Sequence, residues 1–201
     1  MEYSKDKKEI ILNKKPNNLD SFVVDFVSCL DSYVIVSGYV SILLGRSRAT
    51  EDVDLLIPKL KKEDFHKIWK RIHDNGFWCI NTSVFEDAFE MLKEHAIRFA
   101  KKEPVPNIEF KMIKTDFDRY SFENRIKVII NKDILFVSPL EMQIAFKLFL
   151  AANGTDEELG TDKDVEDARY LYRLFKDKIN KDELFKIADK LNIRKKLSWL
   201  K

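Results

Sequence analysis

Cysteine and histidine are scarce in this chain, which argues against a zinc site or a disulfide framework. Two cysteines, Cys29 and Cys79, show no ligand spacing, and each lies among apolar residues, so we expect small core residues. The three histidines, His66, His73 and His95, form no cluster and indicate surface or satisfied side chains. Only five glycines and five prolines accompany 35% charged residues, which favours long charged helices joined by short connections.

Long apolar runs and an excess of one charge are also missing. No apolar stretch approaches the ~20 residues of a membrane-spanning helix, and the first 15 residues lack the apolar centre of a signal peptide. We therefore expect a cytoplasmic protein with no membrane partner. Lysine and arginine number 36 against 34 acidic residues, so no global basic field would attract nucleic acid nonspecifically. A length of 201 residues with 45% apolar content fits one domain, or one domain with a helical extension.

Residues 33–57 carry the strongest chemical pattern. They run from an apolar strand through a Ser-Gly turn, a short apolar helix and a basic loop into a second strand that holds Asp52 and Asp54. Side chains alternate along a strand, so the two aspartates project from the same face. Adjacent carboxylates repel and need a cation or a shared proton, and hard oxygen ligands suit Mg²⁺.

The turn at Ser37 and Gly38 adds a candidate anion site. Serine can cap a helix, and glycine lets a bound group approach the backbone closely. The N–H groups at a helix start attract phosphate. A phosphate site beside a metal-binding acid pair indicates phosphoryl or nucleotidyl transfer.

The three segments at residues 37–38, 45–50 and 52–54 together resemble the nucleotidyltransferase superfamily that includes DNA polymerase β. Within it they are most similar to the small prokaryotic branch of abortive-infection-type nucleotidyltransferase toxins, although Ser37 stands where that branch usually has glycine. The resemblance implies an NTP substrate, Mg²⁺ or Mn²⁺ as cofactor, and Asp52 and Asp54 as metal ligands. It places five residues near the nucleotide: Ser37, Gly38, Arg46, Arg48 and Thr50. The two loop arginines could contact a triphosphate or simply be exposed.

The resemblance also implies a third carboxylate, and Glu109 is our candidate. Residues 107–113 alternate in strand fashion, with Glu109 between Ile108 and Phe110. An acid in that position is costly without a compensating partner. The competing interpretation is an ordinary solvent-facing residue on the same face as Lys111. Two acids in the loop expected after this strand, Asp116 and Asp118, are the alternatives for the third ligand.

A helical block from residue 137 onward supplies a further match. Ser138 and Pro139 predict an N-cap and a first helical position. In the resembling family a lysine on such a helix is associated with the nucleotide's phosphates, and a Lys-Asp-x-x-Asp string follows. Lys147 fits the first feature, and residues 163–167 fit the second, so the resemblance places Lys147 and Asp164 at the nucleotide. Alternatively the lysine snorkels to solvent, and Asp164 and Asp167 only charge a helix start.

The expected fold is an α+β nucleotidyltransferase-like core over residues 1–137, with a twisted mixed sheet flanked by helices. A C-terminal helical region over residues 138–201 packs on that core. The elements expected in the core are helices at 18–29, 39–44, 62–74 and 85–93, and strands at 33–36, 53–57, 77–80, 96–100, 108–113, 126–130 and 134–137.

The expected function is metal-dependent transfer of an NMP from an NTP to a hydroxyl of an RNA, protein or small-molecule acceptor. Catalysis would depend on Asp52, Asp54 and Glu109. Some members of the resembling branch are toxins paired with an antitoxin, which makes an antitoxin a partner to consider. Two alternatives stay open: a catalytically silent nucleotide-binding or interaction module of the same fold, and a structural domain whose acid pair is only a solvated strand end.

Overall fold

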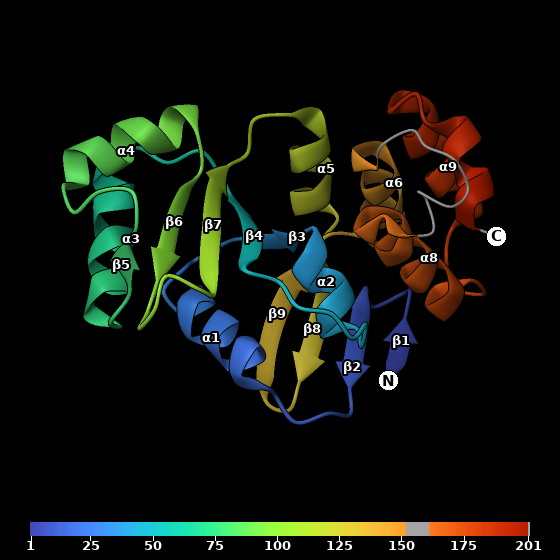
Figure 1. The fold of residues 1–201 in the computed structure, drawn as a ribbon, viewed down its shortest axis with the longest axis horizontal. Helices are drawn as coiled ribbons and strands as arrows, with labels where there is room; N and C mark the ends of the chain where they lie inside the picture. The colour runs from blue at the N-terminus through green and yellow to red at the C-terminus, as the bar shows by residue number, and fades with distance from the viewer. Residues whose placement is uncertain (152–160, 201) are drawn as a thin grey trace.

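A computed structural model describes residues 1–151 and 161–200 of the chain. Within these residues one mixed sheet of nine strands runs through the molecule in the order β1-β2-β8-β9-β3-β4-β7-β6-β5 (Figure 1). Its strands are β1 (Glu2–Ser4), β2 (Glu9–Leu12), β3 (Val34–Val36), β4 (Asp52–Ile57), β5 (Trp78–Cys79), β6 (Ile97–Ala100), β7 (Asn107–Met112), β8 (Ile126–Ile130) and β9 (Asp133–Val137). The mixed sheet with flanking helices confirms the expected fold class.

Two groups of helices lie at the ends of this sheet, and α1, α2 and α5 lie between them (Figure 1). In Figure 1, α3 and α4 lie at the β5–β6 end, whereas α6, α8 and α9 lie together at the other end, where both termini are also found. Helix α6 packs against both α8 and α9. The helices are α1 (Asn18–Val27), α2 (Gly38–Leu43), α3 (Lys62–Asp74), α4 (Phe85–Glu94), α5 (Asp116–Glu123), α6 (Leu140–Leu150), α8 (Lys163–Phe175) and α9 (Lys181–Lys190), followed by a 3₁₀ segment, Arg194–Leu200.

Strand β4 is central to the sheet and has two different faces. It pairs antiparallel with β3 and parallel with β7. Val53 and Leu55 point into the main core and are fully buried. On the same face, Phe110 of β7 meets Phe26 of α1 with ring centroids 6.0 Å apart. This packing fixes the register of β4, so Asp52 and Asp54 must emerge on the opposite face.

Two local expectations are wrong, and two strands were not anticipated. Asp116 and Asp118 begin helix α5 rather than lying in a loop, because Thr115 and Asp118 form a reciprocal capping box. Ser138 does not cap α6, since its hydroxyl bonds to that of Ser121 at 3.1 Å and Pro139 takes the cap position. Strands β1 and β2 were not anticipated, because β2 is held by parallel pairing with the distant strand β8.

Two expectations from composition can be compared directly with the structure. Cys29 and Cys79 are both free and buried, which confirms their assignment to the core. None of the helices within residues 1–151 and 161–200 combines the length and apolarity needed to cross a bilayer.

Candidate active site

Asp54 and Glu109 lie side by side on the open face of the sheet. The parallel register of β4 and β7 places Asp54 opposite Glu109 and Asp52 opposite Asn107. Residues opposite one another in a sheet project from the same face, so these two carboxylates form an acidic pair, with Asp52 on the same face. Both side chains of the pair are largely shielded from solvent, with 17% and 19% exposed.

The ammonium group of Lys111 lies against both members of the acidic pair. Its Nζ is 2.7 Å from Asp54 Oδ1 and 3.3 Å from Glu109 Oε1. Burial lowers the pKa of Lys111, but the two carboxylates outweigh burial, and the net effect is a raised pKa. The sequence did show Lys111 on the face of Glu109, two residues along the strand, but gave no reason to assign it to the site.

A second cation lies on the far side of Glu109. Arg98, its cross-strand partner on β6, holds Nη2 3.9 Å from Glu109 Oε2 and is half exposed. Of the alternative third acids, Asp118 lines a cavity that Asp54 also lines, but its carboxylate is bonded to the backbone at the start of α5. Asp118 accepts from the N–H groups of Thr115 and Lys114, and the side chain of Asp116 is fully exposed to solvent. Glu109 is therefore the acid that the structure places beside Asp54.

The Ser37–Gly38 turn is clamped by Gln143 of helix α6. The Ser37 N–H donates to Gln143 Oε1 at 3.2 Å, and Gln143 Nε2 donates back to the Ser37 carbonyl. Ser37 adopts φ 61° and ψ −140°, a conformation that favours glycine, and its side chain makes no capping bond to α2. Gln143, from the C-terminal helices, thus holds the strained turn in place. No motif in the sequence singled out this residue.

Gly38 is required by the close approach of Arg48. A Cβ atom at position 38 would lie 2.2 Å from Arg48 Nη2, so any other residue would force the guanidinium group to shift from its present position. The next residue anchors α2 from the other side, because the Tyr39 hydroxyl donates to buried Asp20 at 2.8 Å. Burial and the Asp20 carboxylate both raise the pKa of Tyr39, which keeps the hydroxyl protonated as a donor.

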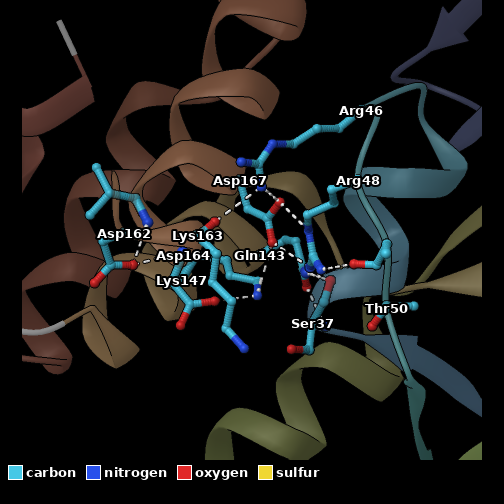
Figure 2. A network of polar contacts seen from close by, with 12 residues as sticks. Ser37, Arg46, Arg48, Thr50, Gln143, Lys147, Asp162, Lys163, Asp164 and Asp167 are labelled. Carbon is cyan, nitrogen blue, oxygen red and sulfur yellow. Dashed lines mark hydrogen bonds and ion pairs between the residues drawn. The ribbon is translucent and has the colours of Figure 1, made fainter. Parts of the chain in front are cut away.

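Four of the expected nucleotide-binding residues gather around Asp167. Figure 2 shows Arg46 and Arg48 reaching Asp167 from the loop before β4, and Lys147 lying near it on the helical side. Arg48 binds in a fork, with Nε 3.1 Å from Oδ1 and Nη2 2.9 Å from Oδ2, and Arg46 also donates to Oδ1. Lys147 contacts Asp164 at 2.5 Å and Asp167 at 3.1 Å. We call these five residues the Asp167 cluster.

The Asp167 cluster is buried and electrostatically complementary. Asp167 is fully buried, and the side chain of Lys147 is only 3% exposed. Burial raises the pKa of Asp167, but the hydrogen bonds from Arg48 and Arg46 and the charges of Lys147 and Arg48 outweigh it and hold the pKa below its ordinary value. The sequence placed Asp167 in the same string as Asp164 without assigning it to the site, and here it is the centre of the cluster.

Thr50 connects the cluster to the acidic strand. Its hydroxyl donates to the Asp52 carbonyl at 3.0 Å, at the point where the loop enters β4. Thr50 therefore acts on the backbone of the strand in this structure. The ten expected site residues divide into three adjoining groups: the acids on β4 and β7, the Ser37–Gly38 turn, and the arginines and helical residues around Asp167, with Thr50 at the junction.

One cavity extends from Ser37 of the turn to Asp54 of the acidic pair. It has a volume of about 260 Å³, close to the lower end of the usual range for small-molecule sites, about 300–1,000 Å³. The polar part of its wall has three charged residues, Asp54, Lys111 and Asp118, together with Ser37, Ser121, Ser138 and Gln143. The remaining wall is mostly apolar and comes from β3, β4, α5 and α6, including Leu56, Phe117, Met142 and Phe146. A charged rim beside an aromatic wall suits a ligand with a flat apolar part and an anionic part.

The donor atoms at the acidic pair fit a hard divalent cation. Within the residues described, no three Asp, Glu, His or Cys side chains are grouped so as to hold a metal ion in their present conformation. Asp54 and Glu109 nevertheless present adjacent carboxylate oxygens, and the ammonium of Lys111 shows that this position attracts positive charge. Oxygen ligands of this kind are those that Mg²⁺ and Mn²⁺ prefer.

Comparison with known proteins locates the fold among nucleotidyltransferases. No family model and no curated protein sequence matches the chain. The solution structure of the antibiotic-resistance factor ANT(2'')-Ia superposes with a TM-score of 0.56 at 12% identity, covering 89% of this chain and 93% of that one. A crystal structure of ANT(2'')-Ia in complex with adenylyl-2''-tobramycin gives 0.53 at 14% identity, covering 87% and 97%. An antigenic nucleotidyltransferase-like protein from Paracoccidioides brasiliensis gives 0.54 at 19% identity, covering 90% and 88%. At these identities the likeness shows a shared fold.

Proposed function

We propose that this protein is a metal-dependent nucleotidyltransferase that moves an NMP from an NTP to an acceptor hydroxyl. One observation carries the proposal: Ser37, Asp54 and Lys111 line a single cavity with an aromatic wall, and Glu109 lies beside Asp54. The nucleoside would occupy the apolar side near Phe117 and Phe146, and the phosphates would face the polar side. The shared fold with nucleotidyltransferases supports the same conclusion.

The acids would supply both cation binding and a proton acceptor. Asp52, Asp54 and Glu109 would hold Mg²⁺ or Mn²⁺, which supplies charge neutralisation of the phosphates when bound. The acceptor oxygen forms a bond to the α-phosphorus as the bond from that phosphorus to the bridging oxygen breaks, and pyrophosphate leaves with the electron pair. Glu109 takes the proton from the attacking hydroxyl. Ser37 contributes its hydroxyl to binding the phosphates.

We assign the Asp167 cluster to positioning. Its arginines hold the loop that enters β4, so the cluster determines where Asp52 and Asp54 lie relative to the C-terminal helices. Within the cluster, Lys147 and Asp164 form an ion pair with one another. This differs from the direct phosphate contact that the sequence resemblance implies for Lys147.

Label transfer from NTPs provides the test. The protein is incubated with α-labelled NTPs, Mg²⁺ or Mn²⁺, and a panel of RNA, protein and aminoglycoside acceptors. We expect transfer by the unaltered protein and a loss of at least about 100-fold for Asp54→Asn, consistent with the loss of a group that stabilises the transition state. Asp189→Asn, an exposed acid on α9, serves as the control and should retain activity. Equal transfer by Asp54→Asn would contradict the proposal.

A silent nucleotide-binding module is the second candidate. Lys111 already pairs with both carboxylates of the acidic pair, which favours an arrangement that binds nucleotide without turnover. Mg²⁺-dependent NTP binding by calorimetry, combined with no label transfer to any acceptor in the panel, would favour this second function.

A further inference from the structure

The ammonium of Lys111 lies where a cation bound by the acidic pair would have to lie. It contacts one oxygen of Asp54 and one of Glu109 at the same time, 2.7 and 3.3 Å away. If both oxygens coordinated a divalent cation, that cation would lie only a few ångströms from the Lys111 ammonium. Like charges repel strongly at such a distance. Occupation of the pair by one cation therefore works against occupation by the other.

The position of Lys111 also gives its side chain somewhere to move. Its side chain is 35% exposed and lines the same cavity as Ser37, Asp54 and Asp118, and it is the one basic residue among the described residues that line this cavity. A lysine carries its charge on a flexible stem and can exchange hydrogen-bond partners without moving the backbone. An anionic group in that cavity would offer the ammonium a replacement for the two carboxylates.

We propose that Lys111 competes with the divalent cation for Asp54 and Glu109, and that phosphates bound in the cavity draw Lys111 away from them. This inference deepens the proposed function and rests on it. Without nucleotide, Lys111 holds the acidic pair and the divalent cation binds weakly. With nucleotide, the ammonium pairs with phosphate and the carboxylates become free, so cation and nucleotide each strengthen the binding of the other by the same factor.

Arg98 does not remove the need for this exchange. Its nearest approach to Glu109 is 3.9 Å, and its side chain is half exposed, so it weakly screens one carboxylate and does not contact Asp54. Lys111 is the cation shared by both acids. Its removal should expose the pair to solution cations, whereas removal of an unrelated strand lysine should not.

Manganese binding measured by electron paramagnetic resonance tests the competition without turnover. Lys111→Met should bind Mn²⁺ alone about tenfold more tightly than the unaltered protein, equivalent to about 1.4 kcal/mol. Lys127→Met is the matched control, because Lys127 also pairs across strands, with Glu9 at 2.9 Å. It should leave Mn²⁺ affinity unchanged, and Lys111→Arg, which keeps the positive charge, should bind Mn²⁺ as weakly as the unaltered protein.

A second titration measures the coupling. With a non-hydrolysable NTP analogue present, Mn²⁺ affinity should rise in the unaltered protein and rise by a smaller factor in Lys111→Met. Lys111→Gln replaces Lys111→Met if circular dichroism shows that the methionine variant is unfolded. Unchanged or weaker Mn²⁺ binding after loss of the charge would overturn the inference, as would a coupling factor that stays the same.

These outcomes are separable from failure of the proposed function. Label transfer by the unaltered protein, together with unchanged Mn²⁺ affinity in Lys111→Met, would reject the role of Lys111 and leave the transferase intact. Tighter Mn²⁺ binding by Lys111→Met without label transfer to any acceptor would support the competition and reject the transferase.

Discussion

Replacing Asp167 by asparagine should be among the most destabilising single changes in this protein. The substitution preserves side-chain shape but removes the negative charge that Arg46, Arg48 and Lys147 share. Among these three, Lys147 keeps a second carboxylate in Asp164, whereas, within the described residues, the arginines keep only backbone carbonyls. Asp167 is fully buried and the two arginine side chains are each 17% exposed, so both guanidinium groups would lose their counter-charge while largely shielded from solvent. Removing one partner from a buried ion pair costs about 3–5 kcal/mol. For a chain of this length that corresponds to a fall in melting temperature of about 6–20 °C.

Asp31 offers a control with the same chemistry at the surface. Arg71 binds Asp31 in a fork, at 2.9 and 2.7 Å, much as Arg48 binds Asp167, but the Asp31 side chain is 77% exposed. An exposed pair contributes about 0–1 kcal/mol, so Asp31→Asn should hardly change stability. Urea unfolding followed by circular dichroism gives both free energies of unfolding. Similar costs for the two substitutions, or a cost below about 1 kcal/mol for Asp167→Asn, would refute the reasoning from burial.

Three further predictions concern the same region. Gly38→Ala should lower the free energy of unfolding by about 1–3 kcal/mol, because the alanine Cβ displaces the Arg48 guanidinium. This cost should largely disappear in an Arg48→Met background, and a double-mutant cycle measured by urea unfolding would show it. Ser37→Gly should raise the free energy of unfolding by roughly 0.5–2 kcal/mol, because glycine adopts the backbone conformation at position 37 without strain. The added entropy of the unfolded chain offsets part of this gain. A lower urea midpoint than that of the unaltered protein would count against the prediction. Finally, the pKa of Asp167 is lowered in the folded state, so its stabilising contribution is present above about pH 4 and lost as pH falls through the lower folded value. The difference in unfolding free energy between the unaltered protein and Asp167→Asn should therefore shrink between pH 5 and pH 2, and a constant difference would be contrary to this prediction.

The elements of the core follow from local patterns that the sequence displays openly. Alternation on either side of Asp52 and Asp54 predicts β4, and alternation around Glu109 predicts β7. The capping pattern at Thr115 and Asp118 was also present and would have predicted α5. Local signals of this kind depend on residues a few positions apart, so they can be identified without knowing the tertiary structure.

The partners of the charged residues are determined by distant parts of the chain. Arg48 and Asp167 are 119 positions apart, and Gln143 reaches a turn 106 positions away. Nothing in the sequence near Arg48 distinguishes an arginine that binds phosphate from one that binds a buried aspartate. Lys111 is an intermediate case, because one of its contacts follows from local spacing and the other does not. Its spacing in the strand places it on the same face as Glu109, but only the register of β4 against β7 brings Asp54 within its reach.

The cluster around Asp167 bears on how such a protein can be divided or recombined. A cut between β9 and α6 would look natural from the change to an all-helical sequence, yet it would separate Arg46 and Arg48 from the aspartate that neutralises them. Transplanting the C-terminal helices from a relative would succeed only if the donor brought an acid to the same position. The two segments should therefore be inherited together, and fragments expressed separately should need each other to become soluble.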